Sequence, residues 1–174
     1  MEAIIPVLHD AIEEVRAIAT ELRPSSIDDI GLLLTLRRRC REFEQRHPGL
    51  RIDLQTPLEE SDIPARLKII LYRIITSVLD DMVPTTNADQ IGLGLWRDNM
   101  TLTLLIDDTA SEDLDKTAQP LANIDPQLSA GLARMEELTT LSGGQFKASY
   151  HAGGGTTLRA SWNVEPEART DRPA

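Results

Sequence analysis

The first 22 residues of the chain carry apolar side chains at the spacing of an α-helix. The apolar positions of this stretch are Ile4, Ile5, Leu8, Ile12, Val15, Ile18, Ala19 and Leu22. Residues three and four apart share one face of a helix, so the pattern predicts an amphipathic helix over Glu2–Leu22. No neighbouring stretch of sequence is expected to cover this apolar face, and the helix therefore needs a partner.

A junction follows that ends this helix and begins another. Pro24 has no N–H to donate and disfavours the helical conformation at Arg23. The residues after it are typical of a helix start: Ser25, Ser26, Asp28 and Asp29. Apolar residues then recur at helical spacing until Pro48-Gly49, so we expect one long helix over Ser26–His47.

The rest of the pattern predicts a mixture of strands and helices. Alternation of apolar and polar residues indicates half-buried strands, and a repeat of three to four residues indicates helices. The expected elements are strand Leu50–Leu54, helix Pro64–Val83, a hairpin of strands Gln90–Trp96 and Met100–Ile106, helix Ala130–Leu141, and strands Gln145–His151 and Thr156–Val164. The chain then divides into an N-terminal helical segment (1–24), an α+β domain (25–164) and a charged tail (165–174) that we expect to be disordered.

The charge of the chain excludes one class of partner. The 174 residues include 28 acidic and 18 basic ones, for a formal net charge of -10. DNA-binding proteins gain most of their affinity by neutralising phosphates, so this acidic balance argues against nucleic acid. The single cysteine, Cys40, excludes a disulfide within one chain and fits a reducing cytoplasm. No apolar run reaches the length of a membrane span, and we expect no membrane contact from this chain.

The stretch Glu21–Leu36, which reads ELRPSSIDDIGLLLTL, resembles a family motif. It is similar to the junction ELRP…L.DLGL..AL between the dimerisation helix and the ATPase domain of NarX/DesK-type sensor histidine kinases. The resemblance extends from Leu8 to about Trp162. It implies an α+β fold of the GHKL (Bergerat) type, a two-layer α/β sandwich with helices on one face of a mixed sheet. It also implies that Glu2–Leu22 is a remnant dimerisation helix, which would make the protein a homodimer.

The predicted helix Pro64–Val83 resembles the nucleotide-binding helix of that family. Its sequence LYRIITSVLDDMV is similar to the family pattern LYRI.QEALTNALKHA. In this register Ser77 replaces the glutamate that assists phosphoryl transfer, and Asp81 replaces the asparagine that holds Mg²⁺. Asp81 remains a candidate magnesium ligand, because Mg²⁺ prefers oxygen donors. Its carboxylate also adds negative charge beside a triphosphate, and no residue evidently substitutes for the glutamate.

The end of the predicted hairpin supplies a candidate adenine contact. The family has the pattern D.G.G at this point, and its aspartate accepts a hydrogen bond from the adenine amino group. Asp107 matches that aspartate, while Thr109 and Ser111 stand where the glycines belong. The resemblance therefore implies a remnant adenine site at Asp107, without the glycines that let the backbone pass close to the base.

Two glycine-containing segments near the C-terminus complete the resemblance. Gly131 fits the motif GhGLaGM.ER, in which other glycines are replaced here. The loop with Gly153, Gly155 and Thr156 matches the family's GGGT element, although on its own such a loop would be interpreted as a simple β-turn. The implied cofactors are ATP and Mg²⁺, and the altered motifs imply that their binding is weakened or lost.

His9 is a candidate phospho-acceptor of a different kind. A carboxylate next to a histidine, here Asp10, orients the imidazole for attack on a γ-phosphate. The spacing speaks against this role, because in the family the acceptor lies on the preceding helix, farther from the Arg-Pro junction. We therefore expect His9 to be an ordinary helix histidine.

Three functions remain open from the sequence. The first is a histidine-kinase-like ATPase domain with a degenerate nucleotide site, which acts in two-component signalling as a regulatory or protein-interaction module with weak or no kinase activity. The second is a divergent but active ATP-binding kinase domain that phosphorylates a histidine outside this chain. The third is a histidine phosphotransferase that uses His9. In each case the expected partner is a response regulator or a partner histidine kinase in the cytoplasm.

Overall fold

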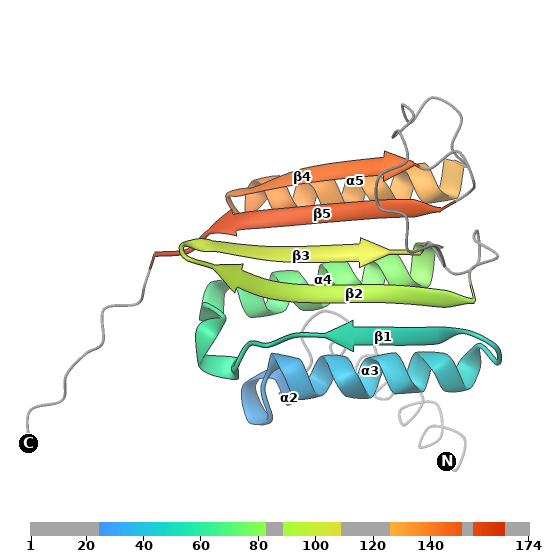
Figure 1. Ribbon diagram of the computed structural model, residues 1–174, viewed down its shortest axis with the longest axis horizontal. Helices are drawn as coiled ribbons and strands as arrows, with labels where there is room; N and C mark the ends of the chain where they lie inside the picture. Colours follow the sequence, from blue (N-terminus) through green and yellow to red (C-terminus); the bar gives the residue numbers. More distant parts are fainter. Residues whose placement is uncertain (1–24, 83–88, 109–125, 151–154, 166–174) are drawn as a thin grey trace, which may run out of the picture.

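The computed structural model describes residues 25–82, 89–108, 126–150 and 155–165 (Figure 1). Its helices are α2 (Ser25–Asp29), α3 (Leu32–Arg46), α4 (Ala65–Met82) and α5 (Pro126–Leu141), with a short 3₁₀ turn η1 (Glu60–Asp62). Its strands are β1 (Arg51–Gln55), β2 (Gln90–Asp98), β3 (Thr101–Asp107), β4 (Gly144–Tyr150) and β5 (Thr156–Asn163). The predicted helix Glu2–Leu22 and nearly all of the tail lie outside the described residues.

The five strands form one mixed sheet in the order β1-β2-β3-β5-β4. β1 runs parallel to β2, and the other neighbours are antiparallel. The predicted hairpin is confirmed, since β2 and β3 pair directly across a tight turn. Asn99 takes a positive φ of 51° in this turn, a conformation that asparagine tolerates better than most residues.

Helices α3, α4 and α5 cover one face of this sheet, and the apolar core lies between the two layers (Figure 1). The sheet contributes alternate residues of its central strands to that core: Ile91, Leu93, Leu95, Leu102, Leu104, Ile106, Leu158, Ala160 and Trp162. The helices contribute residues at helical spacing, among them Leu32, Leu36, Leu67, Leu71, Ile74, Ile75 and Leu79. The α+β two-layer sandwich predicted from the sequence is confirmed.

The long helix expected over Ser26–His47 is wrong, because two helices occupy this stretch. α2 ends at Asp29, and α3 begins at Leu32 after a break at Gly31, whose φ is 88°. The break is stabilised by Glu60, whose side-chain oxygens accept hydrogen bonds from the backbone N–H groups of Leu32 (2.8 Å) and Leu33 (3.1 Å). Those N–H groups belong to the first turn of α3 and have no partner within the helix.

The other expected elements are confirmed within a few residues, and α5 begins at Pro126 rather than at Ala130. Cys40 is buried in the core on α3, and burial raises the pKa of its thiol to about 11. At neutral pH this thiol is therefore protonated and packs as a small apolar side chain. No helix among the described residues is long and apolar enough to span a membrane.

Candidate functional site

Most of the predicted nucleotide-site residues that the structure describes come from four chain segments that meet at one end of the sandwich (Figure 1). α4 ends there at Met82, β3 ends at Asp107, and α5 and β5 begin there at Pro126 and Thr156. Gly153 and His9 lie outside the described residues. Gly155 has a φ of 122°, a conformation that favours glycine and fits the predicted tight loop before β5.

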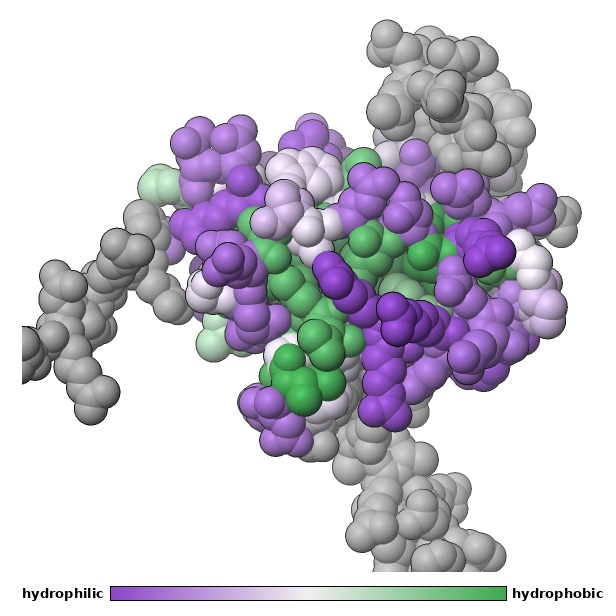
Figure 2. All heavy atoms as spheres, turned by 60° about the horizontal axis from the view of Figure 1, so that its bottom comes forward, coloured by the Kyte–Doolittle hydropathy of each residue, from purple (hydrophilic) through white to green (hydrophobic). Residues whose placement is uncertain are grey.

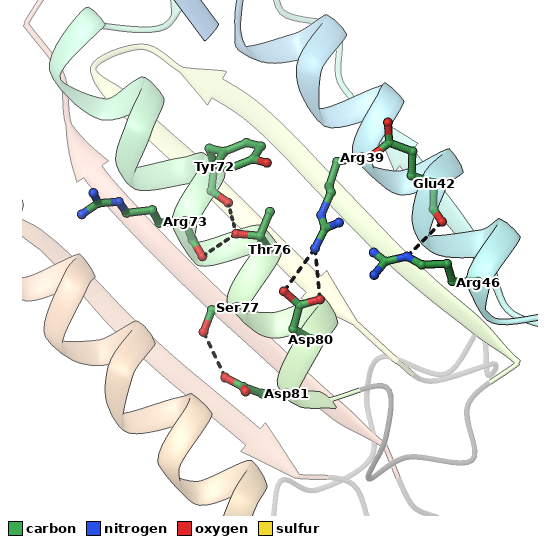
Figure 3. Close-up of polar contacts among 9 residues, drawn as sticks. All are labelled: Arg39, Glu42, Arg46, Tyr72, Arg73, Thr76, Ser77, Asp80 and Asp81. Carbon is green, nitrogen blue, oxygen red and sulfur yellow. Dashed lines mark hydrogen bonds and ion pairs between the residues drawn. The ribbon is translucent and has the colours of Figure 1, made fainter. Parts of the chain in front are cut away.

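Asp81 and Gly131 are brought into direct contact where α4 and α5 pack together. A Cβ atom added to Gly131 would lie 2.9 Å from both the Cβ and the Oδ2 atom of Asp81. Real Cβ atoms do not approach other heavy atoms that closely, so only glycine at position 131 permits this helix contact. Ser77, one turn earlier on α4, donates a hydrogen bond of 3.0 Å to Asp81 Oδ2 (Figure 3).

The neighbouring aspartates Asp80 and Asp81 connect the end of α4 to both adjacent helices. Arg39 on α3 places Nη2 at 3.2 Å from both side-chain oxygens of Asp80 (Figure 3). Carboxylates in the last turn of a helix lie at the negative end of its dipole, where they are unfavourable without donors. Arg39 and Ser77 supply such donors, so the two aspartates stabilise the three-helix layer at this end.

The donor set at Asp81 fits a magnesium ion poorly. Its Oδ2 atom already accepts a hydrogen bond from Ser77 and lies against the backbone of Gly131. Among the described residues no group of three or more His, Cys, Asp or Glu side chains is arranged to hold a metal. Mg²⁺ needs near-ideal octahedral geometry, and a carboxylate committed to a helix contact does not provide it freely.

Asp107 lies on the face of the sheet that the helices do not cover. It pairs with Gly92 on β2, and a Cβ added to Gly92 would lie 3.9 Å from Asp107 Cβ, so both positions share one face. The neighbours Ile91 and Leu93 point to the opposite face, into the core. An adenine contact by Asp107 remains a prediction, and its Cβ is directed away from α4 and α5.

Asp108, which the sequence reasoning missed, points toward the helix layer. It is 5% exposed, and its backbone N–H donates to the carbonyl of Thr156 at 3.2 Å. Its Oδ1 atom in turn accepts a short hydrogen bond from the N–H of Thr156. The signal for it was present in the sequence, because the inward positions Leu102, Leu104 and Ile106 extend at a spacing of two to Asp108.

Thr156 is the second buried polar residue at this end of the sheet. Its side chain is fully buried, and its Oγ1 atom has no hydrogen-bond partner within the described part of the chain. A buried hydroxyl without a partner costs free energy, so it marks a place where an external donor or acceptor would be stabilising. Asp108 and Thr156 thus form a polar pair at the edge of the apolar core, with the chemistry to bind an amide-like or heteroaromatic edge.

Comparison with known proteins gives relatives of one kind. No protein-family model matches the chain. The histidine-protein kinase/phosphatase DegS of Brevibacillus brevis is 26% identical over 157 residues, which is 90% of this chain and 39% of DegS. The sensor histidine kinase MctS of Rhizobium johnstonii is 25% identical over 62% of this chain and 23% of its own length. UhpB of Salmonella typhimurium, also a histidine-protein kinase/phosphatase, is 28% identical over 57% of this chain and 20% of its own length.

Solved structures with some likeness to the chain have low sequence identity. The mycobacterial sensor histidine kinase MprB has a TM-score of 0.49 at 16% identity, over 75% of this chain and 93% of that one. The catalytic domain of histidine kinase ThkA has a TM-score of 0.48 at 11% identity, over 78% and 90% of the two chains. The assignment therefore depends on the sequence relatives, of which this chain spans about two fifths or less. Those relatives confirm the resemblance read from the motifs: the chain is homologous to sensor histidine kinases of the NarX/DesK type.

Proposed function

We propose that the chain is the ATPase-type domain of a two-component signalling protein in which phosphoryl transfer is weak or lost. In this role it acts as a regulatory module toward a response regulator or a partner histidine kinase, as a cytoplasmic homodimer through Glu2–Leu22. The observation that carries the proposal is the contact of Asp81 with Ser77 and Gly131. Asp81 stands where the family has its magnesium-binding asparagine, and this contact engages its side chain in the packing of α4 on α5.

The chemistry of phosphoryl transfer explains why this contact matters. The protein's contribution to that reaction is almost entirely positioning and metal-assisted stabilisation of charge. Ser77 has no carboxylate with which to assist the transfer, and Asp81 would add a negative charge where the triphosphate is already negative. Both changes act in the same direction, which supports a loss of catalysis.

For the adenine base, the proposal takes Asp108 and Thr156 as the contacts in place of Asp107. Asp108 supplies a buried carboxylate, and Thr156 supplies a buried hydroxyl without a partner among the described residues. Together they support nucleotide binding in which the base, rather than the metal and phosphates, contributes most of the free energy. The alternative of an active kinase binds ATP through Asp107, Asp81 and the loop of residues 153–156, and it requires Mg²⁺.

Calorimetric titration of the full chain with ATP, with and without Mg²⁺, tests the proposal. We expect weak binding whose affinity changes less than about threefold when magnesium is added, because Asp81 is engaged elsewhere. A gain of tenfold or more on adding magnesium would support the active kinase instead. Absence of binding at millimolar nucleotide would leave a regulatory module without a nucleotide.

A matched pair of variants tests which of the two aspartates contacts the adenine base of ATP. Asp108→Ala and Asp107→Ala remove the same carboxylate from neighbouring positions on opposite faces of the sheet. We expect Asp108→Ala to abolish the heat of ATP binding and Asp107→Ala to leave it unchanged. The reverse result would restore the adenine site predicted at Asp107 and would contradict the role of Asp108.

A further inference from the structure

Strand β4 forms one edge of the sheet and has a single neighbouring strand. It lies at the end of the strand order, pairs with β5 over all seven of its residues, and has α5 behind it (Figure 1). In an antiparallel pair, the N–H and C=O groups of alternate residues point away from the neighbouring strand. No hydrogen bond from another described residue reaches these outer groups of β4, so they can pair with a further strand.

The opposite edge of the sheet, strand β1, is partly closed. β1 has only five residues, and the backbone N–H of Ile52 donates a hydrogen bond of 2.8 Å to Glu44 Oε1 on α3. A side chain of the neighbouring helix thus occupies the position that an added strand would need. Figure 2 is turned toward this side of the molecule and shows hydrophilic side chains around a narrower apolar area. Of the two edges, β4 therefore offers the longer strand for pairing.

The side chains on the helix side of β4 lack part of their packing. Phe146 and Ala148 are half-buried, whereas Ala160 and Leu158, their partners on β5, are each 1% exposed. The difference arises because β5 has a neighbouring strand on both sides and β4 has one on only one side. Apolar side chains from an added strand would cover Phe146 and Ala148 and remove apolar area from water.

The open side of β4 carries positive charge without a partner. Lys147 and Arg159 lie directly opposite each other on β4 and β5, and both are exposed. Like charges at directly opposed positions of a sheet repel each other. No acidic side chain among the described residues forms an ion pair with either of them. A carboxylate beside Lys147 would offset this repulsion, so the charge at this edge favours an acidic strand.

The same lysine disfavours a second copy of the chain at this edge. Two β4 strands that pair antiparallel over their full length place residue 147 of one copy opposite residue 147 of the other, because it is the middle of Gly144–Tyr150. The two lysines would then repel each other, and a lysine on an edge strand is a common protection against self-pairing. The segment that fits β4 therefore has a different sequence.

We propose that β4 binds an extended acidic segment of a partner protein, which adds a strand to the sheet. Backbone hydrogen bonds attach the segment to β4, its alternate apolar residues cover Phe146 and Ala148, and an intervening carboxylate pairs with Lys147. The contact uses none of the residues assigned to nucleotide binding. It goes beyond the proposed function, since it needs neither ATP nor Mg²⁺.

Calorimetric titration of the full chain without nucleotide tests the proposal with two capped synthetic peptides. One has the sequence Val-Glu-Val-Glu-Val-Glu-Val, and the other has lysine in place of each glutamate. We expect saturable binding of the glutamate peptide at submillimolar concentration and about tenfold weaker binding of the lysine peptide, because only the first complements Lys147. Equal binding of the two peptides, or no binding of the glutamate peptide at millimolar concentration, would overturn the proposal.

Charge reversal at the edge tests the contribution of Lys147. The variant Lys147→Glu should bind the glutamate peptide about fivefold more weakly than the wild type, since one attraction becomes a repulsion. It should bind the lysine peptide more tightly than the wild type does, a gain that requires a folded variant. Arg51→Glu, at an exposed position of β1, makes the same change in charge at the other edge and should leave both affinities unchanged. Unchanged affinities in Lys147→Glu would overturn the proposal.

Pairing through the backbone has a separate readout. The glutamate peptide with every backbone amide N-methylated keeps its charge but cannot donate backbone hydrogen bonds, so it should not bind. Hydrogen exchange of Gly144–Tyr150 in the full chain should slow when the unmodified glutamate peptide is added. Binding of the methylated peptide would overturn strand pairing. Exchange that slows with protein concentration alone would identify a second copy as the occupant and would overturn the choice of a partner protein.

Discussion

The carboxyl group of Glu60 occupies the space that a side chain at Gly31 would need. A Cβ added to Gly31 would lie 2.6 Å from Glu60 Cδ and 2.8 Å from its Oε2 atom. The same carboxylate accepts the hydrogen bonds that begin α3 and receives Lys68 Nζ from α4 at 2.7 Å. The Glu60 side chain therefore joins the turn η1 to α3 and α4. It can do so only because the residue at position 31 is glycine and leaves space for the carboxyl group.

Replacing Gly31 by alanine should destabilise the protein strongly. The substitution forces a residue with a side chain to adopt a φ of 88° and also collides with Glu60. We expect a loss of about 2–4 kcal/mol in the free energy of unfolding, measured by urea denaturation. Gly49→Ala is the matched control, because Gly49 has a φ of 103° with no atom within 4 Å of the added Cβ. Gly49→Ala should lose only about 1 kcal/mol in the free energy of unfolding, the cost of a positive φ for a residue with a side chain. Equal losses in the two variants would contradict a role for Glu60 at position 31.

Replacing Glu60 by glutamine should remove a contribution to stability that depends on pH. Burial tends to raise the pKa of Glu60, but hydrogen bonds from Lys68 and from the N–H groups of Leu32 and Leu33 outweigh it, so the pKa lies below its usual 4.5. A carboxyl with a lowered pKa in the folded state stabilises the protein above its unfolded pKa, and this contribution is lost as pH falls through the folded value.

Urea denaturation of the wild-type protein and Glu60→Gln between pH 7 and pH 3 measures this effect. The wild-type protein should be more stable at pH 7, and the difference should shrink as pH falls below 4.5. Glu136→Gln, which makes the same change at an exposed position of α5, is the control and should follow the wild-type pH dependence. A difference between wild type and Glu60→Gln that stays constant across this range would show that the charge of Glu60 does not matter.

The helix break at Gly31 also shows which part of the fold is hidden from the local pattern. Apolar residues continue at helical spacing on both sides of this glycine, so the sequence predicts one helix. The residue that stabilises the break, Glu60, lies 28 positions from Leu32 along the chain. Periodicity reports only local structure, whereas a cap from a distant turn depends on the tertiary fold. By the same reasoning, strands β2 and β3 could be predicted because their alternation is itself local.

The motifs placed the predicted nucleotide-site residues on segments that the fold brings together, at the ends of α4 and β3 and at the start of β5. Binding of a nucleotide at this end of the sandwich stays a prediction. Motif matching assigned the adenine contact to Asp107, but a motif match carries no information about the face of the sheet on which a residue lies. Counting inward positions from Leu102 places Asp108, and not Asp107, on the side of the helices. The contact of Gly131 with Asp81 joins two helices 50 positions apart, and no sequence pattern reveals it.

The contact between Gly131 and Asp81 leads to a prediction that runs against helix propensity. Alanine is a better helix former than glycine by about 1 kcal/mol, so Gly131→Ala should stabilise α5 if the position were unconstrained. Because the added Cβ would lie 2.9 Å from Asp81, we expect the variant to lose about 1–3 kcal/mol instead. Urea denaturation at neutral pH measures the change.

A double-mutant cycle with Asp81→Gly separates this contact from other effects of the two substitutions. Glycine at position 81 removes the Cβ and the carboxylate together, so Gly131→Ala should cost at least about 1 kcal/mol less in that background than in the wild type. Ser77→Ala provides the comparison, since it removes the hydrogen bond to Asp81 without opening space beside Gly131. In the Ser77→Ala background the cost of Gly131→Ala should therefore remain. Additive changes with Asp81→Gly would mean that the two helices do not depend on each other at this point.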